Sequence, residues 1–234
     1  MNGHTAQLPD ELAGSGIAHL SLDDAARYEE RLAFDPTDEI ELLQTLGLSS
    51  QSTMVEFGPG PGSFALAAAR VARSVVAVDP SQAMCTYLEQ RAAETNTTNL
   101  VVVNAGFLSY IHESPPVDFV FSKNALHHLP DFWKVAALTN VSTILRPSGV
   151  LRLRDLVYSF APQDADRRIA DWIASYGATS GWGPEDLAHH VRDEFSTYGW
   201  ILEGMLERTG FDIVERWISD SEVFARYTCR RTEQ

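Results

Sequence analysis

Short apolar runs recur along the first two thirds of the chain and are separated by longer segments of mixed character. The runs Thr53–Phe57, Ser74–Val78 and Leu100–Val103 are bounded by glycine, proline or polar residues and predict strands. Val117–Phe121 and Val150–Leu156 follow the same pattern. Because helical segments separate these strands, the pattern favours a parallel sheet that helices cover on both faces.

Helices are predicted between the strands and before the first one. One helix opens near Ser21, a candidate N-cap with carboxylates in the first turn, and a second follows Asp35 and ends at Gly47. Three more are expected over residues 63–73, 81–94 and 131–145. This alternation predicts an α/β fold with a doubly wound, mostly parallel seven-stranded sheet.

The alternation of predicted strands and helices stops after Asp155. Residues 159–200 carry many aromatic side chains without a strand pattern, so they predict a helical insertion after the fifth strand. A helix over 200–209 leads to two strands, whose short linker indicates an antiparallel hairpin at the sheet edge. We therefore expect three parts: an N-terminal helical arm or lid over 1–50, a core over 51–158 and 206–234, and a cap over 159–205.

The charge balance bears on possible partners. The 234 residues carry a formal net charge of −14, which disfavours binding to nucleic acid or an anionic membrane. The basic residues are scattered, with Arg152/Arg154 and Arg230/Arg231 as the tight groupings. The sequence shows neither an apolar stretch long enough to span a bilayer nor a secretory signal, so we expect a soluble, cytoplasmic protein.

The clearest chemical signal is a glycine-rich turn between the first strand and the next helix. Gly58, Gly60 and Gly62 are spaced G-x-G-x-G, and Ser63 stands where a dinucleotide fingerprint would have its third glycine. No Lys-Ser/Thr pair follows, which excludes a Walker phosphate loop. Asp79 ends the second strand about twenty residues further on, where a carboxylate can accept both ribose hydroxyls.

This combination resembles the class I, Rossmann-like S-adenosylmethionine-dependent methyltransferases, most of all the small-molecule branch of ubiquinone and menaquinone biosynthesis. The resemblance covers residues 50–158 well. It implies that S-adenosyl-L-methionine is bound and S-adenosyl-L-homocysteine released. It also implies that Asp79 holds the ribose and Met84 covers the adenine, while the methionine part and the sulfonium are flanked by Glu56, Gly58, Gly60 and Gly62.

The chain departs from that family after the third strand. The family often has an aspartate there to receive the adenine amino group, and this chain has Gly106 at about that place. Stacking on Phe107 and a backbone carbonyl are the expected substitutes.

The segment after the fourth strand resembles the family motif that borders the transferable methyl group. Asn124 and His127 are candidates for contact with cofactor or substrate. His128, and also His127, are candidates for a catalytic general base, although either histidine could simply pack under the loop. Asp155 is a further candidate base. The cap is expected to form an aromatic acceptor pocket with Tyr158, Trp182, His189, Glu194 and Tyr198, although such aromatic residues could instead form the core of the cap.

These observations predict methyl transfer to an oxygen, nitrogen or carbon atom of a small molecule, by a monomer or homodimer. One alternative is a non-catalytic subunit that binds S-adenosylmethionine; another is a tRNA or protein methyltransferase, which the negative charge disfavours. No metal is expected, because Ser122-Lys-Asn124 at the end of the fourth strand supplies no carboxylate cluster and the two cysteines form no C-x-x-C pair.

Overall fold

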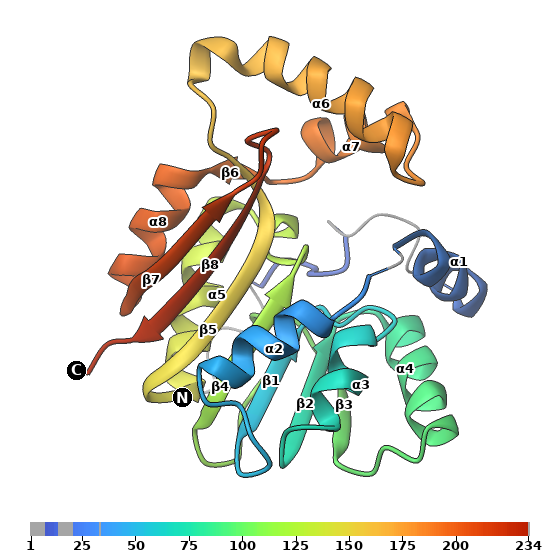
Figure 1. The fold of residues 1–234 in the computed structure, drawn as a ribbon, viewed down its shortest axis with the longest axis vertical. Coiled ribbons are helices and arrows are strands. Elements are labelled where there is room, and N and C mark those ends of the chain that lie inside the picture. The colour runs from blue at the N-terminus through green and yellow to red at the C-terminus, as the bar shows by residue number, and fades with distance from the viewer. Residues whose placement is uncertain (1–7, 14–20, 33, 234) are drawn as a thin grey trace.

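A single sheet forms the centre of the computed structural model, which describes residues 8–13, 21–32 and 34–233 (Figure 1). Seven strands lie in the order β3-β2-β1-β4-β5-β8-β7, and a two-residue β6 pairs with β5. Their bounds are β1 Thr53–Phe57, β2 Ser74–Asp79, β3 Leu100–Asn104, β4 Val117–Lys123, β5 Leu145–Tyr158, β6 Thr197–Tyr198, β7 Phe211–Ile218 and β8 Phe224–Arg231.

The strand directions confirm the predicted fold class. Strands β1 to β5 pair in parallel, whereas β8 is antiparallel to both β5 and β7. The order in which strands are added to the sheet reverses after β3. Strands β2 and β3 lie on one side of β1, and β4 lies on its other side. In a parallel sheet such a reversal opens a crevice at the carboxyl ends of the strands.

Helices cover both faces of the sheet and one of its ends (Figure 1). The helices are α1 Leu22–Leu32, α2 Thr37–Thr45, α3 Ser63–Ala69, α4 Gln82–Glu94, α5 Asp131–Ile144, α6 Ala165–Thr179, α7 Pro184–Asp193 and α8 Gly199–Arg208, with short 3-10 turns η3 Leu126–His128 and η4 Pro162–Asp164. Helices α6 and α7 lie beyond the end of the sheet (Figure 1). Among the described residues, none of the helices combines the length and the apolar character needed to cross a membrane.

The side chains of the central strands alternate between two cores. Val55 and Phe57 point into one core with residues of α5 and α8, whereas Met54 points into the other with residues of α2 and α3. This alternation follows from the two-residue repeat of a strand. A third cluster, around Trp172 and Leu187, gives α6 and α7 a small core of their own.

The largest differences from the sequence expectation concern two element bounds. Strand β5 begins at Leu145, five residues before Val150, because Leu145 pairs with Val117. The extra residues of β5 between Leu145 and Val150 lie at a register shift opposite Val117 and Phe119. Helix α3 ends at Ala69 rather than near residue 73, and Ser74 already pairs with Thr53 in the sheet. Of the expected N-terminal arm, residues 1–7, 14–20 and 33 lie outside the described residues.

A buried ion-pair network joins α2 to the sheet. Both carboxylate oxygens of Glu39 accept from Arg152, at 2.7 Å and 3.2 Å, and Arg154 donates to Glu39 at 2.9 Å. Glu39 and Arg152 are 2% and 4% exposed. Of the Arg152/Arg154 grouping, Arg152 is therefore internal and paired, and Arg154 shares the same buried carboxylate.

Replacing Glu39 with alanine should lower the free energy of unfolding by about 3 kcal/mol or more, because it leaves Arg152 buried without its anion. Urea denaturation followed by tryptophan fluorescence measures this change. Glu41→Ala, an exposed change on the same helix, should stay within about 0.5 kcal/mol of the wild type. Equal effects of the two substitutions would contradict a role for the network.

Candidate functional site

Polar residues collect where the parallel strands end. Glu56 lies near the end of β1, Asp79 ends β2, and Asn124 directly follows β4. Asp155 lies near the end of β5. It follows Arg154, which pairs with Lys123 at the end of β4. The sheet register thus brings residues from four separate segments to one edge, which is the edge where the crevice opens.

The glycines of the turn after β1 have different surroundings. Gly58, Gly60 and Gly62 all have positive φ angles, of 68°, 52° and 88°. A Cβ on Gly62 would lie 2.0 Å from Leu88 Cδ1, so that glycine is needed for packing of α4. A Cβ on Gly60 would meet no protein atom closer than Tyr28, at 3.8 Å, among the described residues. A Cβ on Gly60 would therefore only touch Tyr28, and Gly60 lies in the lining of a pocket.

Asp79 ties the glycine turn to the end of β2. Its Oδ2 accepts from the Gly60 N–H at 3.1 Å, and its Oδ1 accepts from the Ser81 N–H at 2.9 Å. The N-cap of α4 is Ser81, whose Oγ accepts from the Met84 N–H, so Asp79 does not cap that helix. Burial raises the pKa of Asp79 to about 6, although both N–H groups act in the opposite direction.

A first pocket opens over this turn. Gly62 packs against Leu88 and does not line this pocket. The other residues predicted for the cofactor all line it: Glu56, Gly58, Gly60, Asp79, Met84, Gly106, Phe107 and Asn124. Phe107 stacks on Phe57, with ring centroids 4.6 Å apart. The pocket is thus polar at the strand ends and aromatic beside β3.

Glu56 places a buried acid in the wall of this pocket. It is 3% exposed, and its Oε2 makes no hydrogen bond with any residue that the structure describes. Burial, with a smaller effect of Asp79, raises the pKa of Glu56 well above its usual value. An oxygen in this state is suited to a ligand that brings a donor or a positive charge.

Glu11 is a residue of this pocket that the sequence analysis missed. Its carboxylate accepts from the N–H groups of Leu108 and Ser109 at 2.9 Å and 3.0 Å, and a Cβ on Gly106 would lie 2.3 Å from it. The acid that the chain lacks after the third strand is thus supplied near that place by the N-terminal segment. No local signal in the sequence indicated this contact, because Glu11 and Gly106 lie far apart along the chain.

A second cavity of about 820 Å³ lies between the sheet end and the cap helices α6 and α7. It shares Tyr28, Asn124 and His128 with the first pocket. The predicted acceptor residues Trp182, His189 and Glu194 line it, together with the predicted catalytic residues His127, His128 and Asp155.

Tyr158 and Tyr198, also predicted for the acceptor pocket, occupy another position. Both pack against Phe160, with ring centroids 5.3 Å and 6.0 Å from it. Tyr158 also packs edge-on to Tyr198. The structure therefore places these two tyrosines in an aromatic cluster with Phe160.

His127 lies between two carboxylates at the base of the second cavity. Its ring Nδ1 contacts Asp155 Oδ1, its backbone N–H donates to Asp155 Oδ2 at 3.1 Å, and its Nε2 lies 3.0 Å from Glu194 Oε2. Burial alone lowers the pKa of His127, but the two carboxylates outweigh it and raise the pKa to about 9. Although burial opposes the effect, His127 and His190 hold the pKa of Glu194 well below its usual range.

The chain is similar in sequence to known methyltransferases. Residues 54–149 match the family model of the methyltransferase domain. An uncharacterized methyltransferase of Geobacillus kaustophilus is 26% identical over 170 residues, which cover 73% of this chain and 74% of that protein. Another, from Oceanobacillus iheyensis, is 26% identical over 195 residues, which cover 83% and 84%. The protein is a methyltransferase.

The fold of this methyltransferase recurs in solved structures. A SAM-dependent methyltransferase from Aquifex aeolicus superposes with a TM-score of 0.64 at 15% identity, over 91% of this chain and all of that one. At this identity the likeness concerns the fold. The family implies S-adenosylmethionine as the methyl donor, whereas the names of these relatives specify no methyl acceptor.

Gly60→Val should weaken binding of S-adenosylhomocysteine by about 1–3 kcal/mol or more, because the added side chain occupies the open space of the first pocket. Isothermal calorimetry measures this loss. Gly47→Val is the matched control, since Gly47 has a φ of 107° and nothing within 4 Å of its would-be Cβ. It imposes backbone strain without filling the pocket and should leave the affinity unchanged. Normal binding by a folded Gly60→Val variant would refute the placement.

Proposed function

We propose that the protein transfers a methyl group from S-adenosylmethionine to an oxygen, nitrogen or carbon atom of a small molecule held in the second cavity. The observation that carries this proposal is the junction of the two pockets. Tyr28, Asn124 and His128 line both, so a donor in one pocket and an acceptor in the other would meet at the end of β4. Holding two reactants in contact is a major part of catalysis in such displacements.

The first pocket fits the donor. The unpartnered Glu56 Oε2 suits the ammonium of the methionine part, and Asp79 can accept from the ribose hydroxyls. Phe107 and Met84 offer apolar surface for the adenine, with Glu11 close to Gly106. When bound, S-adenosylmethionine supplies an electrophilic methyl group on a sulfonium.

The second cavity supplies the acceptor site. Its walls include the aromatic side chains of Trp172, Tyr176 and Trp182 and charged residues of both signs, which suits a small molecule with an apolar body and a polar reacting group. His128 borders both pockets and is therefore placed to take a proton from the acceptor. The net charge of −14 makes a nucleic-acid acceptor the less favoured alternative.

Calorimetry with S-adenosylmethionine and S-adenosylhomocysteine, with NADH as a control, tests the donor assignment. Both adenosyl compounds should bind and NADH should not. Asp79→Ala should weaken binding by about 2 kcal/mol through loss of the charge-assisted bonds to ribose. Asp79→Asn keeps an oxygen for the Gly60 N–H, so its affinity should lie between those of the wild type and of Asp79→Ala. Unchanged affinity in Asp79→Ala would overturn the ribose assignment, and NADH binding would overturn the donor.

The affinity for S-adenosylhomocysteine should depend on pH through Asp79. The ribose hydroxyls donate to the ionised carboxylate, so binding requires the form that prevails above a pKa of about 6. As the pH falls below that value, affinity should fall by about tenfold per pH unit until the ligand-bound pKa is reached. Calorimetry across the range shows the slope, and Asp79→Asn should reduce it to the part that comes from Glu56, whose pKa is also raised. A wild-type profile as flat as that of Asp79→Asn would contradict this linkage.

A further inference from the structure

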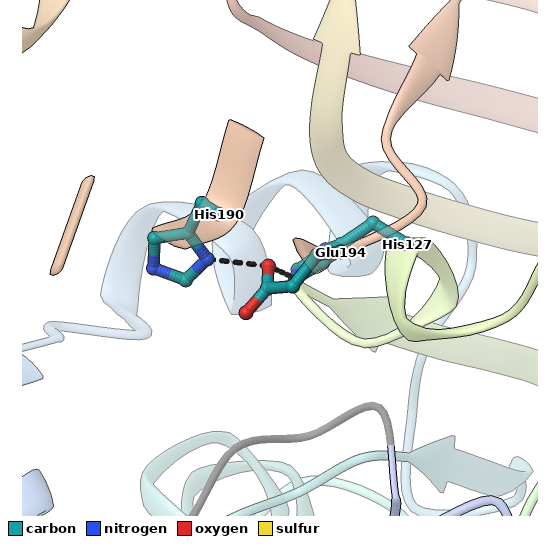
Figure 2. Close-up of side chains that lie close together, drawn as sticks. All are labelled: His127, His190 and Glu194. Carbon is teal, nitrogen blue, oxygen red and sulfur yellow. Dashed lines mark hydrogen bonds and ion pairs between the residues drawn. The ribbon is translucent and has the colours of Figure 1, made fainter. Parts of the chain in front are cut away.

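Three side chains that are remote in the sequence converge at the base of the second cavity. His127 belongs to η3, His190 to α7, and Glu194 follows α7 directly. One donor atom from each lies within 4.8 Å of the others. Figure 2 shows the Glu194 carboxylate between the two imidazoles, with an interaction to each.

The orientation of His127 exposes one ring nitrogen to this cluster. Asp155 contacts Nδ1, and it is itself fixed by the backbone N–H groups of His127 and Leu156, at 3.1 Å and 2.8 Å. A proton on Nδ1 leaves a lone pair on Nε2. That Nε2 is buried and makes no hydrogen bond of acceptable geometry within the described part of the chain, although Glu194 Oε2 is 3.0 Å away. When His127 is neutral, two electron-rich atoms face each other, and either a proton on Nε2 or a cation bound in its place would satisfy both.

The donor set indicates which cation. Two imidazoles and one carboxylate suit Zn²⁺ and other divalent transition metals, whereas Mg²⁺ and Ca²⁺ prefer oxygen ligands. A carboxylate behind the ligating histidine, as Asp155 stands behind His127, is the usual arrangement at such sites. His128 Nδ1 lies 4.0 Å from Glu194 Oε1, and both residues line the second cavity.

We propose that His127 Nε2, His190 Nδ1 and Glu194 bind one divalent transition-metal ion, with Zn²⁺ the best match. The ion would replace a proton on His127, which is released to solvent on binding. Because all three residues line the second cavity, a remaining coordination position faces the space assigned to the acceptor. Only that role in holding the acceptor rests on the proposed function; the metal site itself does not. From the sequence no metal is expected, because the end of the fourth strand supplies no carboxylate cluster; His190 and Glu194 lie far from His127 along the chain.

Metal binding by the full chain tests the site without any turnover. After treatment with a chelator, the protein should bind one Zn²⁺ per chain in calorimetry, and Co²⁺ should give visible absorption typical of nitrogen and oxygen ligands. His190→Ala and Glu194→Gln should each weaken Zn²⁺ binding by at least about tenfold, since each removes a ligand. His190 is partly exposed, with 21% of its side-chain surface accessible, so its loss should spare the fold.

His189→Ala is the matched control for metal affinity, because His189 neighbours His190 on α7 but pairs with Asp193. It should bind Zn²⁺ as the wild type does. Absence of Zn²⁺ and Co²⁺ binding in the wild type, or equal affinities in His189→Ala, His190→Ala and Glu194→Gln, would overturn the proposal. Binding of S-adenosylhomocysteine, measured on the same samples, separates failure of the metal site from failure of the proposed function.

Discussion

The contacts of His127 hold the functional edge of this methyltransferase together. Its backbone N–H and ring Nδ1 both meet Asp155 of β5, its carbonyl accepts from the Phe195 N–H at 2.9 Å, and its Nε2 faces Glu194. One residue thereby joins the sheet, the turn after β4 and the segment that follows α7. Part of the border between the two pockets lies in that turn, with Asn124 and His128, so their relative position depends in part on this junction.

The same edge carries acids that a sheet selected for stability alone would avoid. Glu56, Asp79 and Asp155 are 3%, 6% and 3% exposed, and burial of a carboxylate is costly without partners. Backbone N–H groups compensate Asp79 and Asp155, whereas Glu56 keeps an oxygen without a partner among the described residues. Asn124, with a φ of 51°, adds backbone strain at the same place. The concentration of unfavourable features marks this edge as functional.

The two N-terminal helices are attached with different strength. Helix α2 is anchored by the buried Glu39 network, whereas α1 reaches α4 through a Glu29–Arg91 pair and reaches α7 through Arg31 and Asp186, at 2.6 Å and 3.3 Å. The Arg31–Asp186 pair is exposed and the Glu29–Arg91 pair is partly exposed, and ion pairs near the surface contribute little to stability. Tyr28 of α1 nevertheless lines both pockets. The element that covers the pockets is therefore held less firmly than the sheet beneath them.

The sequence by itself determined the order of strands and helices, the glycine turn and Asp79, because apolar runs, turn residues and short spacings are local signals. It also predicted His127, His128, Asp155 and Glu194 individually. Tertiary structure alone decided that Glu194 faces His127, that Glu11 lies against Gly106, and that Glu39 neutralises Arg152. These contacts join distant segments, and hydrophobic periodicity indicates that a residue is buried without indicating against what. The partners follow only from how the helices pack on the sheet.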